Sequence, residues 1–300
     1  MKYLQGYKWG LNPHIQKLLY TTVTEKMVSY AAAVWANPMQ GQKIKHLSSI
    51  ERPFTLNITR AYCTTASDEI IVLAGLLPLH IRVEEEASRQ LVKQLRRTAT
   101  FAEDIFLPEE YEAQAPHLHI HPSQKGVGVR IRLNPTSTDS HVHTEIYTDG
   151  SKTDNNTGSA FIVLQDQSNI YQWKGQLRTN SVFQGEAVAI AHAISYLQEQ
   201  QITPAVIKTD SQSSLYAINN PEHYYPIIQQ IQQDLRDHPE IHISLEWIKA
   251  HVGHYGNELA DRLAKEAANG QAYEQINIPW PISHLKRSLR LKSIGQFQEE

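Results

Sequence analysis

Residues 147–151 read Tyr-Thr-Asp-Gly-Ser and place an acidic residue, Asp149, at the end of a predicted strand and directly before a glycine. A metal ion or a phosphate backbone can approach such a carboxylate closely, because Gly150 has no side chain in the way. Asp-Gly is also a common turn signal, and Asp149 can equally open a hairpin. On these residues alone, the turn is the favoured interpretation.

The composition is that of a globular protein. Its 300 residues, of which 41% are hydrophobic and 20% charged, suffice for one large domain or two modest ones. The single cysteine, Cys63, excludes an internal disulfide framework and a cysteine zinc site, and it suits a reducing compartment. The sequence has no run of about 18 apolar residues and no signal-peptide core at its start. We therefore expect an intracellular protein, cytoplasmic or nuclear, that is not secreted and has no membrane partner.

The charge is distributed unevenly along the chain. Residues 1–140 carry 16 Lys and Arg against 13 Asp and Glu, whereas residues 141–300 carry 12 against 18. A protein that binds nucleic acid by bulk electrostatics is usually basic. The acidic second half therefore argues against a simple phosphate-binding module and favours a site whose carboxylates hold cations.

Residues 1–105 are predicted to form a separate helical segment. Apolar residues recur at helical spacing from Pro13 to Val34, and Asn37-Pro38 is a stop signal. A second helix is expected from residue 43 to a break at Pro53, and an amphipathic helix after Pro78. No catalytic constellation is visible among these helices.

Residues 106–141 are predicted to be a linker with short strands, because prolines interrupt them repeatedly. His117, His119 and His121 alternate in this segment and could bind a transition metal on one face of a strand. No carboxylate or cysteine accompanies them, and the solvated linker is the favoured interpretation.

The second half has an α/β pattern, which predicts a mixed five-stranded sheet flanked by helices over residues 142–270. Three alternating or apolar segments indicate an antiparallel meander, and two further strands alternate with helices. Residues 271–300 are expected to be a C-terminal tail. Its basic stretch, 285–292, can track phosphates or form an exposed helix, and the helix is favoured.

Four acidic residues occupy unusual positions in this pattern. Two follow predicted strands, and two lie in the first turns of predicted helices, so that all four are expected at one edge of the sheet, where open α/β folds place ligands. Their charges would repel one another unless cations intervene, and their hard oxygen ligands suit two Mg²⁺ ions, with Mn²⁺ as a substitute. Each also has a structural alternative, namely a turn, a buried ion pair, a helix cap and a solvated helix face. The residues are, in the same order, Asp149, Glu186, Asp210 and Asp261.

The motifs around these carboxylates, residues 147–152, 185–190, 209–213 and 247–261, resemble those of type 1 ribonuclease H. More narrowly, they are similar to the ribonuclease H domain that follows reverse transcriptase in arthropod-type non-LTR retrotransposons. The resemblance implies a ribonuclease H-like fold. It also implies cleavage of the RNA strand of RNA·DNA hybrids, leaving 3′-hydroxyl and 5′-phosphate ends.

The resemblance further implies that the four carboxylates are the catalytic metal ligands and that His251 assists proton transfer or product release. Ser151 and Asn257 lie beside carboxylates and are candidates for contacts with the substrate backbone or its 2′-hydroxyl. Their alternatives are a turn hydroxyl for Ser151 and a helix cap for Asn257. A zinc site at His251 and His254 is disfavoured, because the glycines around them indicate a flexible loop.

The first half resembles the C-terminal, thumb-side part of the reverse transcriptase of the same elements, in residues 30–35, 47–52, 58–62 and 72–79. The aromatic-x-Asp-Asp polymerase signature and an endonuclease domain are absent, so DNA synthesis is not expected. The chain is then a piece of a longer Pol polyprotein, whose remainder is a candidate partner.

Two other functions stay open. Residues 219–239 lack the basic grip region of some bacterial ribonucleases H, which leaves a catalytically decayed nucleic-acid-binding remnant as the alternative. Another nuclease or an integrase of the same broad fold class is the third hypothesis, and it is not favoured by the motif spacing.

Overall fold

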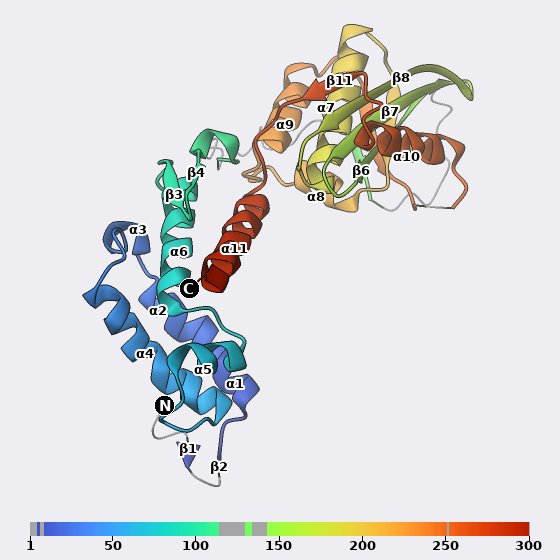
Figure 1. The fold of residues 1–300 in the computed structure, drawn as a ribbon. Coiled ribbons are helices and arrows are strands. Elements are labelled where there is room, and N and C mark those ends of the chain that lie inside the picture. The colour runs from blue at the N-terminus through green and yellow to red at the C-terminus, as the bar shows by residue number, and fades with distance from the viewer. Residues whose placement is uncertain (1–4, 7–8, 114–129, 134–142, 251, 300) are drawn as a thin grey trace. The chain divides into compact units, whose positions relative to one another are not determined.

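The structure, a computed structural model, describes the chain except residues 1–4, 7–8, 114–129, 134–142, 251 and 300. Contacts within the chain divide it into two compact units, residues 1–111 with 282–300 and residues 112–281. The first unit therefore contains both the beginning and the end of the chain, and the second contains the large sheet (Figure 1).

The first unit is built mainly from helices. Side chains of α4 (Gln42–Thr59) and α6 (Leu79–Lys93) meet in a core cluster around Leu47 and Leu79, and a second cluster surrounds Tyr20. The predicted helix end at Pro53 is wrong: α4 continues through this proline, since packed residues on both sides hold the helix. The other elements described in this unit are β1 (Gln5–Gly6), β2 (Trp9–Gly10), α1 (Pro13–Leu19), the π-helical segment η2 (Tyr20–Thr24), α2 (Glu25–Val28), α3 (Ala32–Trp35), α5 (Ser67–Ala74), β3 (Ala99–Phe101), β4 (Asp104–Phe106), η3 (Pro108–Glu110) and α11 (Ile282–Glu299).

The apolar periodicity between Pro13 and Val34 does not mark the buried face in this unit. Met27 and Val34 are 73% and 81% exposed, whereas Tyr20 and Glu25 are buried. The π-helical segment η2 adds a residue to the turn, so the helix that follows it presents a different face to the core. Ala31, which has the left-handed conformation, then ends the helical segment that begins at Pro13. A 3.6-residue period therefore overstates the continuity of this helix.

The C-terminal stretch 285–292 forms a helix, as expected, but it is not exposed all round. Leu285 and Leu289, four residues apart in α11, are fully buried, and α11 packs against α6. Ser293 Oγ donates a hydrogen bond of 2.8 Å to Glu85 of α6. The tail is thus an integral helix of the first unit.

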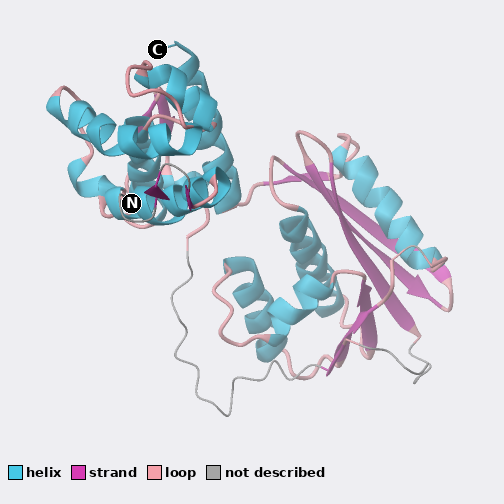
Figure 2. Cartoon of the chain, turned by 90° about the horizontal axis from the view of Figure 1, so that it is seen from below, coloured by secondary structure: helices cyan, strands magenta, loops and turns pink. Residues whose placement is uncertain are grey.

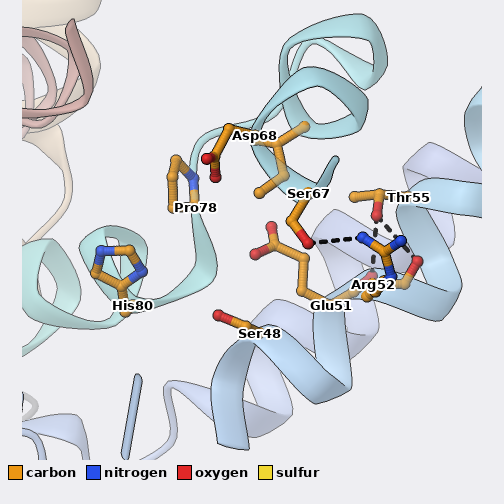
Figure 3. Close-up of a pocket in the computed structure, with 9 residues that line it drawn as sticks. Ser48, Glu51, Arg52, Thr55, Ser67, Asp68, Pro78 and His80 are labelled. Carbon is orange, nitrogen blue, oxygen red and sulfur yellow. Dashed lines mark hydrogen bonds between the residues drawn. The ribbon is translucent and has the colours of Figure 1, made fainter. Parts of the chain in front are cut away.

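A small cavity of about 50 Å³ lies among α4, α5 and the start of α6, and Glu51 lines it (Figure 3). This volume has room for one or two water molecules, and so it excludes a nucleotide. Glu51 is 2% exposed; its carboxylate accepts hydrogen bonds from Tyr20 Oη at 3.3 Å and from the Leu79 N–H at 3.0 Å. Burial raises the pKa of Glu51 from 4.5 to about 7, although these hydrogen bonds oppose the shift.

We predict that Glu51→Gln removes a pH-dependent loss of stability. The pKa of Glu51 is raised in the folded state. The contribution of the Glu51 side chain to the free energy of unfolding is therefore complete below pH 4.5 and is lost as the pH rises through about 7. The difference in unfolding free energy between wild type and Glu51→Gln should change by roughly 3 kcal/mol over this window. Urea unfolding from pH 4.5 to 8 measures it, with exposed Glu69→Gln as the control. Parallel curves for wild type and Glu51→Gln would contradict the prediction.

The described residues of the second unit form a sheet of seven strands in the order β11-β8-β7-β6-β9-β10-β5. Its centre is the predicted arrangement: an antiparallel meander of β6 to β8, followed by β9 parallel to β6 and β10 parallel to β9. The two strands beyond the five expected are short edge strands from the predicted linker and tail. The strands are β5 (Arg130–Arg132), β6 (Thr144–Lys152), β7 (Thr157–Gln165), β8 (Ser168–Leu177), β9 (Ala205–Thr209), β10 (Ile243–Trp247) and β11 (Glu274–Ile276).

Helices cover both faces of this sheet (Figure 2), which confirms the predicted α/β class. Ile146 and Phe161 face the core formed with α7 (Val182–Glu199), α8 (Gln212–Asn219) and α9 (Pro226–Asp237). Tyr147 and Ile162 face α10 (Tyr255–Ala268) on the other side. Neighbouring residues of each strand thus point to opposite layers, as the strand period of two requires. Among the helices of the described part of the chain, none is long and apolar enough for a membrane span.

Candidate active site

Asp149 lies within β6, not in a turn. Asp149 and Gly150 pair with Ala160 and Ser159 of β7, and β6 continues to Lys152. The parallel neighbour β9 ends earlier, with Thr209 opposite Thr148. Asp149 is therefore the first residue of β6 beyond the end of β9, and the turn alternative is wrong.

Gly150 brings β6 into direct contact with the first turns of α7. A Cβ atom at Gly150 would lie 2.5 Å from the Glu186 backbone nitrogen and 2.9 Å from the Gly185 carbonyl carbon. At these distances the backbone atoms leave no room for any side chain. The contact places Glu186 of α7 beside Asp149 of β6.

The other two carboxylates come from the end of β9 and from α10. Asp210 directly follows β9, and Asp261 lies in the second turn of α10, which packs on the same face of the sheet as Tyr147. Asp149 interacts electrostatically with all three of the other carboxylates. The structure therefore gathers the four predicted residues Asp149, Glu186, Asp210 and Asp261 around one place.

Burial and like charges disfavour ionisation at this place. Burial, followed by the charge of Asp210, raises the pKa of Asp149 from 3.8 to about 7; Asp261 and Glu186 add to the shift and the Gly150 N–H opposes it. Burial also raises the pKa of Glu186. Such a group of carboxylates is an electrostatic well for a cation, because a positive charge would relieve both desolvation and mutual repulsion.

Three of the carboxylates are hydrogen-bonded to neighbouring side chains. Asp210 Oδ2 accepts from Asn257 Nδ2 at 3.2 Å, and Asp261 Oδ2 forms an ion pair with Lys265 Nζ at 2.7 Å. Glu186 Oε2 accepts from Ser211 Oγ. In this arrangement, no three His, Cys, Asp or Glu side chains of the described residues are grouped closely enough to hold a metal ion. Three of the carboxylates instead accept hydrogen bonds from neighbouring side chains.

Asn257 is not the helix cap considered for it from the sequence, and its contact with a substrate stays a prediction. It is 3% exposed, and its Nδ2 donates a hydrogen bond to Asp210. The N-cap of α10 is His254, three residues earlier. Asn257 Oδ1 is buried without a hydrogen-bond partner among the described residues. This unpaired oxygen and the hard oxygen ligands around it fit a hydrated divalent cation.

The remaining predicted site residues are placed less completely. Ser151 is half-buried in β6, where it pairs with Gly158 rather than forming a turn. His251 lies outside the described residues, as do His117, His119 and His121, so their roles and the zinc alternative stay predictions. The site also contains Ser211 and Ser214, which the sequence did not predict as site residues. Two serines three residues apart after an aspartate at a strand end are nevertheless a helix-cap signal.

We predict that Gly150→Ala destabilises the second unit and disturbs the site. The added methyl group would collide with backbone atoms of Gly185 and Glu186, and overpacking of this kind typically costs about 1–3 kcal/mol. Gly295→Ala in α11 is the control, because its Cβ would meet no atom within 4 Å and alanine favours a helix. Thermal unfolding should show a lower Tm for Gly150→Ala only. A Tm equal to that of the wild type would contradict the close contact.

Asp149→Asn is predicted to stabilise the metal-free protein at high pH. The raised pKa means that the contribution of Asp149 to stability is lost as the pH rises through about 7, whereas asparagine stays neutral. With EDTA at pH 8, the variant should be more stable by at least about 1 kcal/mol, and the gain should shrink toward pH 5. Urea unfolding measures it, with exposed Asp154→Asn as the matched control. Equal or lower stability at pH 8 would show that the carboxylates do not repel.

Residues 141–269 match the family model described as RNase H. No curated protein matches the chain.

Similar solved structures include a viral and an archaeal protein. The prototype foamy virus protease–reverse transcriptase is 22% identical, with a TM-score of 0.39 over 45% of this chain and 22% of the viral chain. RNase H1 from the halophilic archaeon Halobacterium salinarum NRC-1 is 18% identical, with a TM-score of 0.36 over 42% of this chain and 98% of that chain. The match thus spans less than a quarter of the viral protein's length.

Proposed function

We propose that this chain is a divalent-metal-dependent endonuclease that hydrolyses the RNA strand of RNA·DNA hybrids. The observation that carries the proposal is the meeting of Asp149, Glu186, Asp210 and Asp261 in the part of the chain that matches the RNase H family, where burial and the other carboxylates raise the pKa of Asp149. A site of this kind calls for an external positive charge.

The four carboxylates would hold two Mg²⁺ ions, or Mn²⁺ in their place. When bound, such ions activate water and stabilise charge on the scissile phosphate and the leaving oxygen. Asp149 is the central ligand in this proposal, because its pKa responds to all three of the other carboxylates. Gly150 contributes by its lack of a side chain, which lets β6 and α7 bring Asp149 and Glu186 together.

The chain supplies further groups for the reaction. His251 is proposed to move a proton, since imidazole titrates near neutral pH. Ser151 is proposed to contact the substrate backbone or the 2′-hydroxyl that distinguishes RNA from DNA. The products are then a 3′-hydroxyl and a 5′-phosphate end.

The wider context is also a proposal. We assign residues 1–105 to a reverse-transcriptase-derived helical segment, 106–141 to a linker and 142–270 to the ribonuclease H domain. Within the predicted tail, 271–300, helix α11 belongs to the helical unit. A chain of this organisation would be a part of the Pol polyprotein of a non-LTR retrotransposon. Its motifs, rather than the solved neighbours, support this origin.

The full chain should cut the RNA strand of a labelled RNA·DNA hybrid in Mg²⁺ and leave double-stranded RNA and DNA intact. Asp149→Asn should lose activity by more than about a hundredfold, which exceeds the usual effect of losing an outer-sphere partner of a metal. Asp154→Asn, the same change at an exposed position, should stay active. Gel analysis of the cleavage products also reports the chemistry of their ends.

Three results would overturn this proposal. A wild type that leaves the hybrid uncut in both Mg²⁺ and Mn²⁺ is not a ribonuclease H. Hybrid binding without cleavage, unchanged in Asp149→Asn, would support the alternative of a decayed nucleic-acid-binding remnant. Cleavage or joining of duplex DNA would support the integrase-like hypothesis.

A further inference from the structure

Glu186 is held by two buried serines that the proposed mechanism does not use. Ser211 Oγ donates a short hydrogen bond to Glu186 Oε2, and Ser214 Oγ lies 3.4 Å from the same oxygen. Ser211 is 5% exposed and Ser214 is fully buried. Both belong to the segment that directly follows Asp210, and so they connect the end of β9 to α7.

The two hydroxyl groups lie within hydrogen-bond distance of each other. Their oxygens are 2.9 Å apart, and Ser211 Oγ also accepts from the Ser214 backbone N–H at 3.3 Å, which makes Ser211 the N-cap of α8. Each serine has one hydroxyl proton. The Ser211 proton can go to Glu186 Oε2 or to Ser214 Oγ, and the charged carboxylate is the stronger acceptor. Ser214 Oγ can itself donate to Glu186 Oε2.

This arrangement goes beyond what a helix cap requires. An N-cap serine needs only to accept from the backbone, and its own proton can point anywhere. Here the proton is aimed at the Glu186 carboxylate, which burial would otherwise leave poorly solvated. No hydrogen bond between described residues engages Glu186 Oε1, so this second oxygen is available to a cation.

We propose that Ser211 and Ser214 are positioning residues that clamp the Glu186 carboxylate by Oε2 and leave Oε1 turned to the metal site. This inference rests on the proposed function and deepens it. The clamp fixes the orientation of one ligand before any cation binds. It also links two carboxylates, because Ser211 is the immediate neighbour of Asp210.

A set of variants distinguishes the effect of losing the Ser211 hydroxyl donor from the effect of losing the helix cap. Ser211→Gly removes the donor but costs a helix N-terminus only a few tenths of a kcal/mol, and Ser211→Thr keeps both the donor and the cap. Ser214→Ala removes the second hydroxyl. Its matched control is Ser195→Ala, in which the lost hydroxyl bonds only the Ala191 carbonyl in the same helix as Glu186.

We would measure Mn²⁺ affinity of the full chain by calorimetry without nucleic acid, together with the Tm of each variant. Ser211→Gly should weaken Mn²⁺ binding about tenfold, the usual effect of losing a partner that orients a metal ligand. Ser214→Ala should weaken it less, whereas Ser211→Thr and Ser195→Ala should bind as the wild type does. Hybrid cleavage by Ser211→Gly should require a correspondingly higher Mg²⁺ concentration.

The outcomes distinguish the clamp from the proposed function. Ser211→Gly that binds Mn²⁺ as tightly as the wild type overturns the clamp, even where the wild type cuts hybrids. Ser211→Thr that binds as weakly as Ser211→Gly also overturns it, because the effect would then not depend on the hydroxyl. The expected affinity series in a wild type that does not cut hybrids supports the clamp and refutes the nuclease. A wild type that binds no Mn²⁺ overturns both.

Discussion

The site depends on a contact between two pieces of backbone, where β6 crosses the start of α7 at Gly150 and Gly185. Because neither residue has a side chain, a strand and a helix that would normally be separated by a layer of side chains touch directly. Asp149 and Glu186 are the next residues along each backbone. Their proximity therefore follows from main-chain packing rather than from the reach of flexible side chains, and rigid elements hold a site more closely than loops do.

The same rigidity creates an electrostatic cost. β6, α7, the end of β9 and α10 each bring one carboxylate, and the structure cannot separate them without disturbing its two cores. The metal-free protein therefore satisfies them by proton uptake at Asp149 and by local donors such as Asn257, Lys265 and Ser211. The grouped carboxylates that favour cation binding therefore destabilise the protein when no cation is bound, a trade-off that is usual at functional sites.

Much of the second unit could be predicted because its signals are local. Alternating strands, the capping residue Ser181 and the breaks at proline and glycine all act within a few residues of where they stand. The edge strand β11 escaped prediction, and β5 was expected only as a short strand of the linker and not as part of the sheet. A three-residue strand has no period of its own and forms only against a neighbour. The hydrogen bond from Ser211 to Glu186 escaped for the same reason: the two residues are 25 positions apart.

In the first unit, local pattern and burial disagree. The π-helical turn η2 and the left-handed Ala31 change the direction of the apolar face twice within a dozen residues, and no sequence period survives such changes. In β6, by contrast, pairing to β7 and β9 fixes which residues face α7 and which face α10, so one misplaced residue would exchange the two cores. Where both faces of an element are buried, side-chain direction is strongly determined, and this pairing fixes Asp149 within β6 although Asp149-Gly150 alone favours a turn.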